Sequence, residues 1–507
     1  MPLRIDHALT AKKLVPRVER MFELSAQKIL GIEKSWKPAD GTPVFTVKGR
    51  YTSRGWTEWT QGFQFGSAIL QFDATGDTKF LEIGRRNTIE RMATHVSHVG
   101  VHDHGFNNIS TYGNLLRLMH EGKIDWNDRE KDFYELALKV SGAVQAARWT
   151  DLNGRRGYIY SFNGPHSLFI DTMRTLRVLA VAHRLGHVLM SERDQRISLL
   201  SRVLKHSDLT ARQAVYFGSG RDAYDQRGRV AHESVFNVND GSYRCPNSQQ
   251  GYSPFSTWTR GLAWALLGFA EELEFLSTIP PAKLEEASAS RWVNTGLAFL
   301  SKSGKELDAR KRRTLKLLRE SAKTSARQTQ EIMLEAALAT TDFYLAHCCA
   351  DGIPMWDTGA PNLHRLPANY LCKPADPFNK WEPVDSSAAA IAAQGLIRLG
   401  NYLAGKIDKK NAARYRQAGL TITRTLLEEP YLSTKPKHQG LLLHSVYHRP
   451  NGWDYVAPGQ KVPNGESSMW GDYHLRELAL MLLREARGEP YLTFFGCVPE
   501  ANRAASR

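Results

Sequence analysis

Residues 260–273, RGLAWALLGFAEEL, carry the pattern that decides the fold. Leu262, Leu266, Phe269 and Leu273 repeat at intervals of four, three and four residues, so they lie on one face of an α-helix. The same periodicity recurs in residues 77–96, 173–183, 331–347, 386–404, 411–427 and 473–487. Alternating patterns typical of strands are short and local, as in GRYTSRGWTEW and GYIYSF. The chain is therefore predicted to be all-α.

Long segments rich in Gly, Pro, Asn and Asp separate these helices and are predicted to be loops. They span residues 101–114, 151–167, 236–256, 351–385 and 445–472. Alternating short and long connections favour helical hairpins packed side by side, and the sequence shows no tight solenoid repeat. A closed ring of hairpins, an α/α toroid, suits this length. No Pro/Ser-rich linker divides residues 1–507, so we predict a single domain whose long loops gather at one mouth.

Composition excludes several classes of protein. The 507 residues are 42% apolar and 23% charged, as in globular proteins, and 67 Lys and Arg against 52 Asp and Glu give a net charge of +15. No run reaches the roughly 18–20 apolar residues that a membrane span needs. The first 24 residues mix charges into every turn, unlike a secretory signal, so we expect a cytoplasmic protein. The five cysteines show no C-x-x-C spacing and no zinc pattern.

One segment concentrates the positive charge. Residues 301–330 carry ten Lys and Arg against three Asp and Glu, a local +7. Leu307, Leu315, Leu318 and Ala322 form an apolar stripe along it. We predict a basic helical insertion near residues 285–330 and favour a solvated amphipathic helix outside the ring. Contact with an acidic polymer or partner is the alternative.

Two carboxylates are candidates for chemistry. Asp103 lies in H-D-H-G-F (102–106) just after a predicted helix, and Asp171 lies in F-I-D-T-M (169–173) near a predicted helix start. Taken singly, the first is more often a polar turn and the second a helix cap, since helix starts stabilise carboxylates. Burial of Asp171 against the flanking apolar residues would instead raise its pKa, as a general acid at neutral pH requires.

A further group combines a cation with aromatic rings. Gln250 precedes a predicted helix on which Arg260 and Trp264 are four residues apart, so that the guanidinium can lie against the indole. Such a pair can present a charge and a stacking plane to an anionic sugar, or it can brace two helices. Asp385, which opens D-S-S-A-A-A-I-A-A, is interpreted as the cap of a closely packed helix.

Seven motifs in the same order resemble glycoside hydrolase family 88, the unsaturated glucuronyl hydrolases. They are W-T-x-G-F (59–63), H-D-x-G-F (102–106), F-I-D-T-M (169–173), Q-G-Y-S-x-x-S-x-W-x-R-G-x-A-W (250–264), D-G-I-P-x-W-D (351–357), D-S-S-A-A-A-I-A (385–392) and W-G-D-Y (470–473). The resemblance covers roughly residues 56–485 and implies an (α/α)6 barrel. Residues near 151–160, 205–230 and 285–330 are expansions over a typical member.

The resemblance assigns roles to individual residues. It implies that Asp171 is the catalytic acid/base and that Asp103 is the second essential carboxylate. Tyr158 and Tyr160 are candidates for one further aromatic wall position. The substrate-binding positions that it implies are Trp59, Phe63, His102, His232, Gln250, Arg260 and Trp264. Of these, Arg260 with His232 and Gln250 is expected to meet the substrate carboxylate.

The activity that the resemblance implies is hydrolysis of unsaturated uronyl ends left by polysaccharide lyases. Hydration of the C4=C5 vinyl ether would release the aglycone, with no cofactor and no metal. We expect the oligosaccharide substrate to be the partner, and neither nucleic acid nor a membrane; subunit number is left open. Two alternatives remain: an unsaturated rhamnogalacturonyl hydrolase, and a non-catalytic toroid that binds acidic glycans. H-D-x-G-F favours the glucuronyl side, and the presence of both Asp103 and Asp171 counts against a pure binder.

Overall fold

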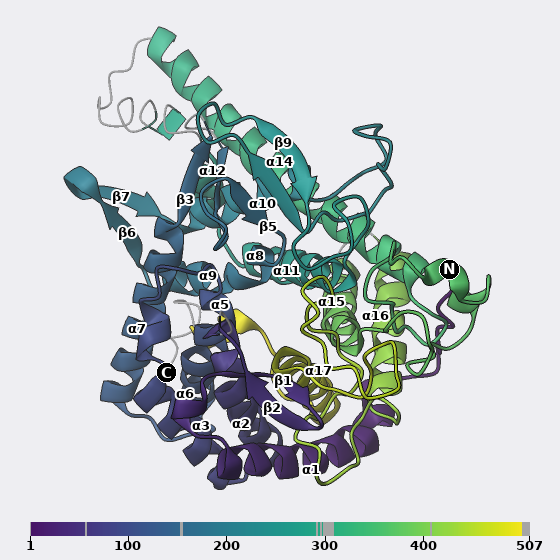
Figure 1. Ribbon diagram of the computed structural model, residues 1–507. Helices are drawn as coiled ribbons and strands as arrows, with labels where there is room; N and C mark the ends of the chain where they lie inside the picture. The colour runs from purple at the N-terminus through teal and green to yellow at the C-terminus, as the bar shows by residue number, and fades with distance from the viewer. Residues whose placement is uncertain are drawn as a thin grey trace.

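Helices dominate the computed structural model, which describes residues 2–55, 58–152, 156–289, 293–294, 297, 309–405 and 408–498 (Figure 1). The α-helices are α1 (Ala11–Ser35), α2 (Gln61–Thr75), α3 (Thr78–Arg91), α4 (Ala93–Val96), α5 (His104–Asn108), α6 (Asn114–His120), α7 (Asp128–Ala147), α8 (Thr172–Thr175), α9 (Arg177–Arg184), α10 (Leu199–Gln213), α11 (Thr259–Leu276), α12 (Pro281–Ser288), α14 (Ala309–His347), α15 (Ser386–Ala404), α16 (Lys409–Leu426) and α17 (Met469–Arg487).

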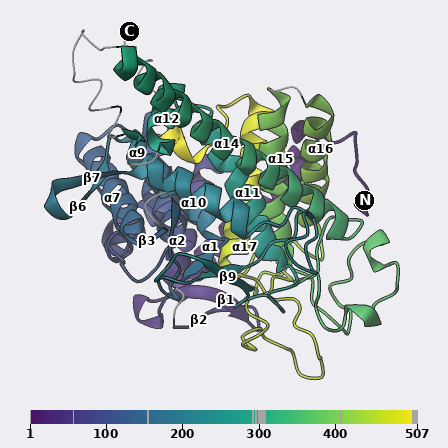
Figure 2. The same ribbon diagram turned by 90° about the horizontal axis from the view of Figure 1, so that it is seen from above.

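Short antiparallel strands lie between these helices. The strands are β1 (Pro43–Val47), β2 (Arg50–Ser53), β3 (Trp149–Leu152), β4 (Arg156–Ile159), β5 (Ser167–Phe169), β6 (Val188–Ser191), β7 (Gln195–Ser198), β8 (Glu233–Phe236) and β9 (Tyr243–Asn247). The pairs β1–β2, β3–β4 and β6–β7 are hairpins, and β5, β8 and β9 form a three-stranded sheet in that order. In Figure 2, β1, β2, β9 and the long loops lie at one end of the helices.

The inner helices form a closed ring. In turn, α17 packs on α2, α2 on α5, α5 on α8, α8 on α11, α11 on α15, and α15 again on α17. Every residue of α11 is buried, as an inner helix requires, whereas α1 buries only one face. Helices α1, α3, α7, α10, α14 and α16 pack outside this ring. The predicted all-α (α/α)6 class is confirmed.

Most predicted helices are found where their periodicity placed them. The run at 386–404 matches α15 (Ser386–Ala404), and Asp385 caps it by accepting hydrogen bonds from the backbone N–H groups of Ser387 and Ala388. Helix α3 begins after Asp77, as predicted, but Ile89 does not lie on its buried face and is 41% exposed. Phe80 and Ile83 lie on the buried face.

One predicted loop is wrong. Residues 101–114 contain α5, a π-helical turn at Ile109–Gly113 and the first residue of α6. Gly105 suggested a turn, yet it serves a close helix approach: a Cβ there would collide with the Thr175 carbonyl of α8. The glycine therefore brings the segment containing Asp103 next to the segment containing Asp171.

The basic segment is the N-terminal half of α14, whose C-terminal half packs on α11. Leu318 and Ala322 are buried in a small cluster with Ala289 and Val293, and Leu315 packs against this cluster. The end of α14 that carries the basic residues extends past the ring (Figure 1). Residues 301–308, including Leu307, lie outside the described residues. The single-domain assignment remains a prediction. Among the described residues, none of the helices is long and apolar enough to cross a membrane.

Candidate active site

A cavity of about 880 Å³ opens among the loops at the mouth. Its wall includes Gly55, Glu58 and Trp59, together with residues from the segments 98–103, 162–163, 249–250 and 447–453. Of the predicted site residues, those that line it are Trp59, Asp103, Asp171, Gln250, Arg260 and Trp264. The structure thus brings together segments that are up to about 400 residues apart in sequence.

Asp103, Asp171 and His102 form one buried cluster at the base of this cavity, hereafter the mouth cluster. Asp103 is 6% exposed and Asp171 is 8% exposed, and both line the cavity. The His102 Nε2 atom lies 3.2 Å from Asp171 Oδ1 and 3.8 Å from Asp103 Oδ1. Asp103 directly precedes α5, and Asp171 directly precedes α8 after strand β5. Close packing of α5 on α8 sets this separation.

Burial and mutual charge move the pKa values of this cluster in different directions. Burial favours the uncharged form of all three groups. It raises the pKa of Asp103 to about 6. For Asp171 the charge of His102 and their hydrogen bond outweigh burial, so its pKa lies below the ordinary value. Burial is likewise outweighed at His102, where the two carboxylates raise the pKa. The expectation that burial would raise the pKa of Asp171 is therefore wrong for the free site.

The same three side chains could hold a metal ion. One ligand atom from each lies within 4.8 Å of the others. A histidine with two carboxylates is a donor set that several divalent cations accept. The same geometry also fits a metal-free site in which His102 and Asp171 share a proton, because a protonated imidazole balances the charge of one carboxylate. The expectation that no metal is needed remains a prediction.

His232 lies behind the cavity wall and orients the loop that carries Gln250. His232 is buried and directly precedes strand β8. Its Nδ1 accepts hydrogen bonds from the N–H groups of Gln249 (3.0 Å) and Gln250 (3.4 Å). Burial lowers the pKa of His232 to about 4, so the ring is neutral near pH 7. An Nδ1 that accepts places the proton on Nε2. His232 thus positions neighbouring wall residues.

Arg260 lines the cavity, but its guanidinium is largely occupied by protein groups. Its Nη1 donates to Asp385 Oδ2 (3.3 Å) and to the Val446 carbonyl, and its Nη2 donates to Gln250 Oε1 (2.8 Å) and the Tyr447 carbonyl (2.8 Å). Each terminal nitrogen carries two hydrogens, so these four hydrogen bonds use all four N–H donors of Nη1 and Nη2. A bidentate contact with a substrate carboxylate would have to break some of them.

The stacking partners of Arg260 also differ from the prediction. Its guanidinium lies 4.5 Å from the ring centre of Trp258 and 4.7 Å from that of Trp470, and Trp264 is not its partner. The Arg260 bond fixes Gln250 through its oxygen, which leaves the Gln250 amide N–H₂ as the donor available to a ligand. Arg260 therefore braces two loops and α15 while adding positive potential to the wall.

Aromatic rings form one side of the cavity. Trp59 stacks on Trp470 with ring centres 5.1 Å apart and planes 27° apart, and Trp264 packs against Phe106 at 4.9 Å. Phe63 does not reach the cavity: it is fully buried beneath Trp59, at 6.1 Å in an edge-on contact. The predicted wall position of Phe63 is therefore a core position, because α2 turns its side chain inward.

Sequence reasoning missed several wall residues. Phe162, rather than Tyr158 or Tyr160, is the lining aromatic ahead of Asp171; it stacks on His102 at 6.0 Å. The Tyr158 hydroxyl is bonded to the Pro165 carbonyl, and the Tyr160 ring lies under Arg148. Other lining residues come from one loop and are Tyr447, His448, Asn451 and Trp453. Only the high donor content of the 445–452 segment signalled them.

Comparison with known proteins identifies relatives that align with most of the chain. No family model matches. The unsaturated glucuronyl hydrolase of Bacillus sp. (strain GL1) is 24% identical over 455 residues, which covers 87% of this chain and 90% of that protein. The unsaturated chondroitin disaccharide hydrolase of Streptococcus agalactiae serotype III is 22% identical, over 85% and 82% of the two chains. The solved unsaturated glucuronyl hydrolase from Streptococcus agalactiae superposes with a TM-score of 0.63 at 19% identity, over 96% and 98%.

The chain is similar to unsaturated glucuronyl hydrolases over most of its length. The resemblance noted from seven motifs is thereby confirmed over most of the sequence. The shared fold follows from the structural comparison, and the named relatives support a glycoside hydrolase. At 22–24% identity the similarity does not assign roles to individual residues, so those roles depend on the geometry of the site.

Proposed function

We propose that the protein hydrolyses oligosaccharides that end in an unsaturated uronic acid, the 4-deoxy-hex-4-enuronic acid left by polysaccharide lyases. The single observation that carries this proposal is the mouth cluster: two carboxylates share one histidine at the base of an aromatic-walled cavity. The two carboxylates raise the pKa of His102, so the cluster keeps a proton to higher pH than a free imidazole does, beside a space large enough for a disaccharide. The relatives' names supply the substrate class.

The reaction adds one water across a vinyl ether. A proton adds to C4 of the sugar, and the ring oxygen stabilises the resulting cation at C5. Water adds its oxygen to C5 and loses a proton to the same carboxylate. The hemiketal then opens to a ketone at C5, and C1 expels the aglycone as an alcohol. One carboxyl group that first donates and then accepts a proton is sufficient for these steps.

Asp171 is proposed to be that group, with His102 as its proton reservoir. In the free site the charge of His102 holds Asp171 ionised. An entering uronate adds negative charge and excludes water, and both changes raise the pKa of Asp171. The proton shared across the 3.2 Å contact between His102 Nε2 and Asp171 Oδ1 then passes to the carboxylate. Asp103, whose pKa burial raises to about 6, is proposed to hydrogen-bond the sugar hydroxyls.

The cavity wall is proposed to bind the rest of the sugar. Trp59 offers an apolar ring for stacking, Trp264 adds only a small part of its surface because it is 2% exposed, and the Gln250 amide N–H₂ offers a donor to the uronate. Arg260 contributes its charge without its hydrogen-bonding fork, because protein groups already occupy both terminal nitrogens. We therefore expect carboxylate binding through neutral donors in a positive potential.

The test is a panel of lyase-generated disaccharides with unsaturated glucuronyl or galacturonyl ends, followed by loss of the ultraviolet absorbance of the double bond. We expect turnover of glucuronyl disaccharides, unchanged after treatment with a chelator. Preferential turnover of a galacturonyl–rhamnose disaccharide would indicate the rhamnogalacturonyl alternative. Binding without any loss of absorbance across the panel would indicate a non-catalytic glycan-binding toroid.

A further inference from the structure

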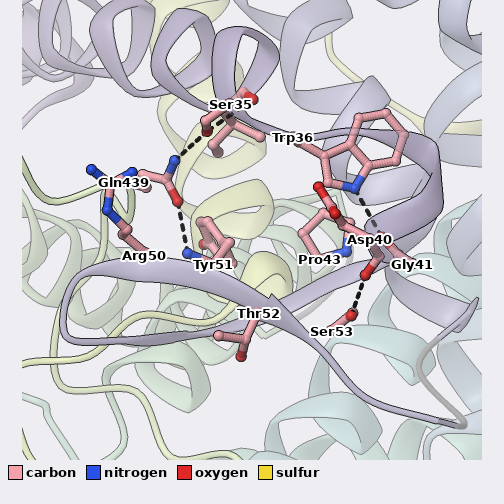
Figure 3. Close-up of a pocket in the computed structure, with 11 residues that line it drawn as sticks. Ser35, Trp36, Asp40, Gly41, Pro43, Arg50, Tyr51, Thr52, Ser53 and Gln439 are labelled. Carbon is pink, nitrogen blue, oxygen red and sulfur yellow. Dashed lines mark hydrogen bonds between the residues drawn. The ribbon is translucent and has the colours of Figure 1, made fainter.

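A second cavity lies beside the β1–β2 hairpin, hereafter the hairpin cavity. It has a volume of about 410 Å³ and sits between the C-terminal end of α1 and the two strands (Figure 3). It shares no lining residue with the mouth cavity. The two are nevertheless close in sequence, because Ser53 lines the hairpin cavity and Gly55 lines the mouth cavity.

Hydrogen bonds between distant segments hold the walls of the hairpin cavity. Gln439 bridges α1 and β2: its Nε2 donates to Ser35 Oγ at 2.7 Å, and its Oε1 accepts from the Tyr51 N–H at 2.7 Å. The Trp36 indole N–H donates to the Gly41 carbonyl at 2.8 Å. Figure 3 shows these bonds around an open centre. A ligand would therefore meet a preorganised frame, which lowers the entropy cost of binding.

The frame leaves opposite charges at its two ends. Figure 3 shows Arg50 beside Gln439 at one end and Asp40 beside Trp36 at the other. Within the described residues, the Arg50 guanidinium has no ion pair or hydrogen bond, and it is exposed. Asp40 accepts a hydrogen bond from the Lys37 N–H through Oδ2, so Oδ1 remains an available acceptor. The cavity can thus take an anion at one end and hydroxyl donors at the other.

We propose that the hairpin cavity binds a hexuronate residue of an acidic saccharide. A hexuronate carries a carboxylate that the Arg50 guanidinium can bind and hydroxyls that can donate to Asp40. Trp36 and Tyr51 add aromatic surface to the lining, although Arg91 lies over the Trp36 ring. No double bond is needed, so this site would recognise saturated units of the same chains. The choice of a saccharide over other anions rests in part on the proposed function.

The test follows the indole N–H resonance of Trp36 in ¹⁵N-tryptophan-labelled protein, assigned with Trp36→Phe, during titration with D-glucuronate. This sugar is saturated and cannot be hydrated, so binding is measured separately from turnover. We expect a saturable shift that needs about tenfold more ligand in Arg50→Gln, since a charge-assisted hydrogen bond is lost. Lys48→Gln is the matched control, because Lys48 is exposed on the same hairpin outside the cavity, and it should titrate as wild type does.

Three outcomes would overturn the proposal. A glucuronate titration that shifts other indole resonances but leaves Trp36 unmoved would restrict saccharide binding to the mouth. Equal affinity for D-glucose would remove the role of the carboxylate and of Arg50. Inorganic sulfate that shifts Trp36 as strongly as glucuronate would make the cavity a general anion site. None of these results depends on whether the unsaturated disaccharides are hydrolysed.

Discussion

Two buried clusters of charge differ in what they can do. The mouth cluster places two carboxylates on one histidine beside a cavity. A second cluster, hereafter the core network, lies among the inner helices and pairs each acid with arginine; its members are Arg174, Arg177, Arg398, Glu271, Glu274 and Glu477. None of its members lines the mouth cavity.

The difference lies mainly in access to a cavity, because among the described residues the neighbouring Glu272 is also buried without an ion pair and burial raises its pKa. Three arginines face three glutamates in the core network, with Arg174 and Glu477 in contact at 2.6 Å and Arg398 and Glu274 at 2.8 Å. The mouth cluster has two acids for one base, so it must store a proton or carry net charge. Buried ionisable groups alone therefore do not indicate catalysis; an unbalanced set that opens onto a cavity does.

The largest expected effect is on turnover in the mouth cluster. Asp171→Asn keeps the shape of the side chain but cannot donate a proton to C4. We expect the rate on an unsaturated disaccharide to fall by about 10²–10⁴-fold, the usual contribution of general acid–base catalysis. Asp351→Asn is the control, because Asp351 is another carboxylate affected by burial, which raises its pKa to about 6, yet it does not line the cavity. Equal loss in both variants would remove the special role of Asp171.

The next effect is on stability in the core network. Arg398→Met leaves Glu274 and Glu271 without one of their cationic partners and removes a bond to the Leu492 carbonyl. We expect the free energy of unfolding to fall by about 3–5 kcal/mol, while the folded protein turns over substrate normally. Chemical denaturation checks the first statement and steady-state kinetics the second. Lost turnover with an unchanged free energy of unfolding would contradict a purely structural role of the core network.

A smaller effect links the mouth cluster to pH. Burial raises the folded-state pKa of Asp103 to about 6, above its ordinary value of 3.8. The stability that protonated Asp103 contributes is therefore complete below about pH 4 and is lost as pH rises through about 6, by at most about 3 kcal/mol. Asp103→Asn cannot ionise, so its melting temperature relative to wild type should be higher at pH 8 than at pH 4.5. A pH-independent difference would contradict this assignment.

The smallest effect is expected for charges that are neither buried nor near a cavity. Arg313, Lys316, Arg319 and Lys323 are exposed on the N-terminal half of α14. Their joint replacement by glutamine should change disaccharide turnover by less than about twofold, because charges farther than about 8–10 Å are screened at moderate salt. A large loss on the disaccharide would place this helix close to the active site. A loss confined to long oligosaccharides at low salt would indicate steering of acidic chains.

Local pattern predicted the helices well because burial imposes a period of 3.6 residues. Helix α15 has the bounds expected from its sequence, and Asp385 caps it as expected. Motif order also indicated which acids meet, although the contact itself depends on packing at Gly105. Side-chain direction was harder to predict. Trp59 and Phe63 belong to one motif, yet the first lines the cavity and the second lies in the core.

The role of Arg260 could not be predicted for a similar reason. Its motif places it at the mouth, but two of its bonding partners are carbonyls of Val446 and Tyr447, which lie 186 and 187 residues further along the chain. No local pattern reveals that a distant loop will occupy a guanidinium. The pKa values of Asp103 and Asp171 also depend on the fold, since each reflects burial first and then the charge of His102 beside it.

The most direct test of the account is turnover of an unsaturated uronyl disaccharide in D₂O, with the product examined by mass spectrometry and NMR. If the mouth cluster hydrates the double bond, deuterium appears at C4 and the ultraviolet absorbance is lost as fast as the aglycone is released. Asp171→Asn should suppress both signals together. A released uronic acid that keeps its double bond and carries no deuterium at C4 would contradict the account, because the glycosidic bond would then break directly at C1.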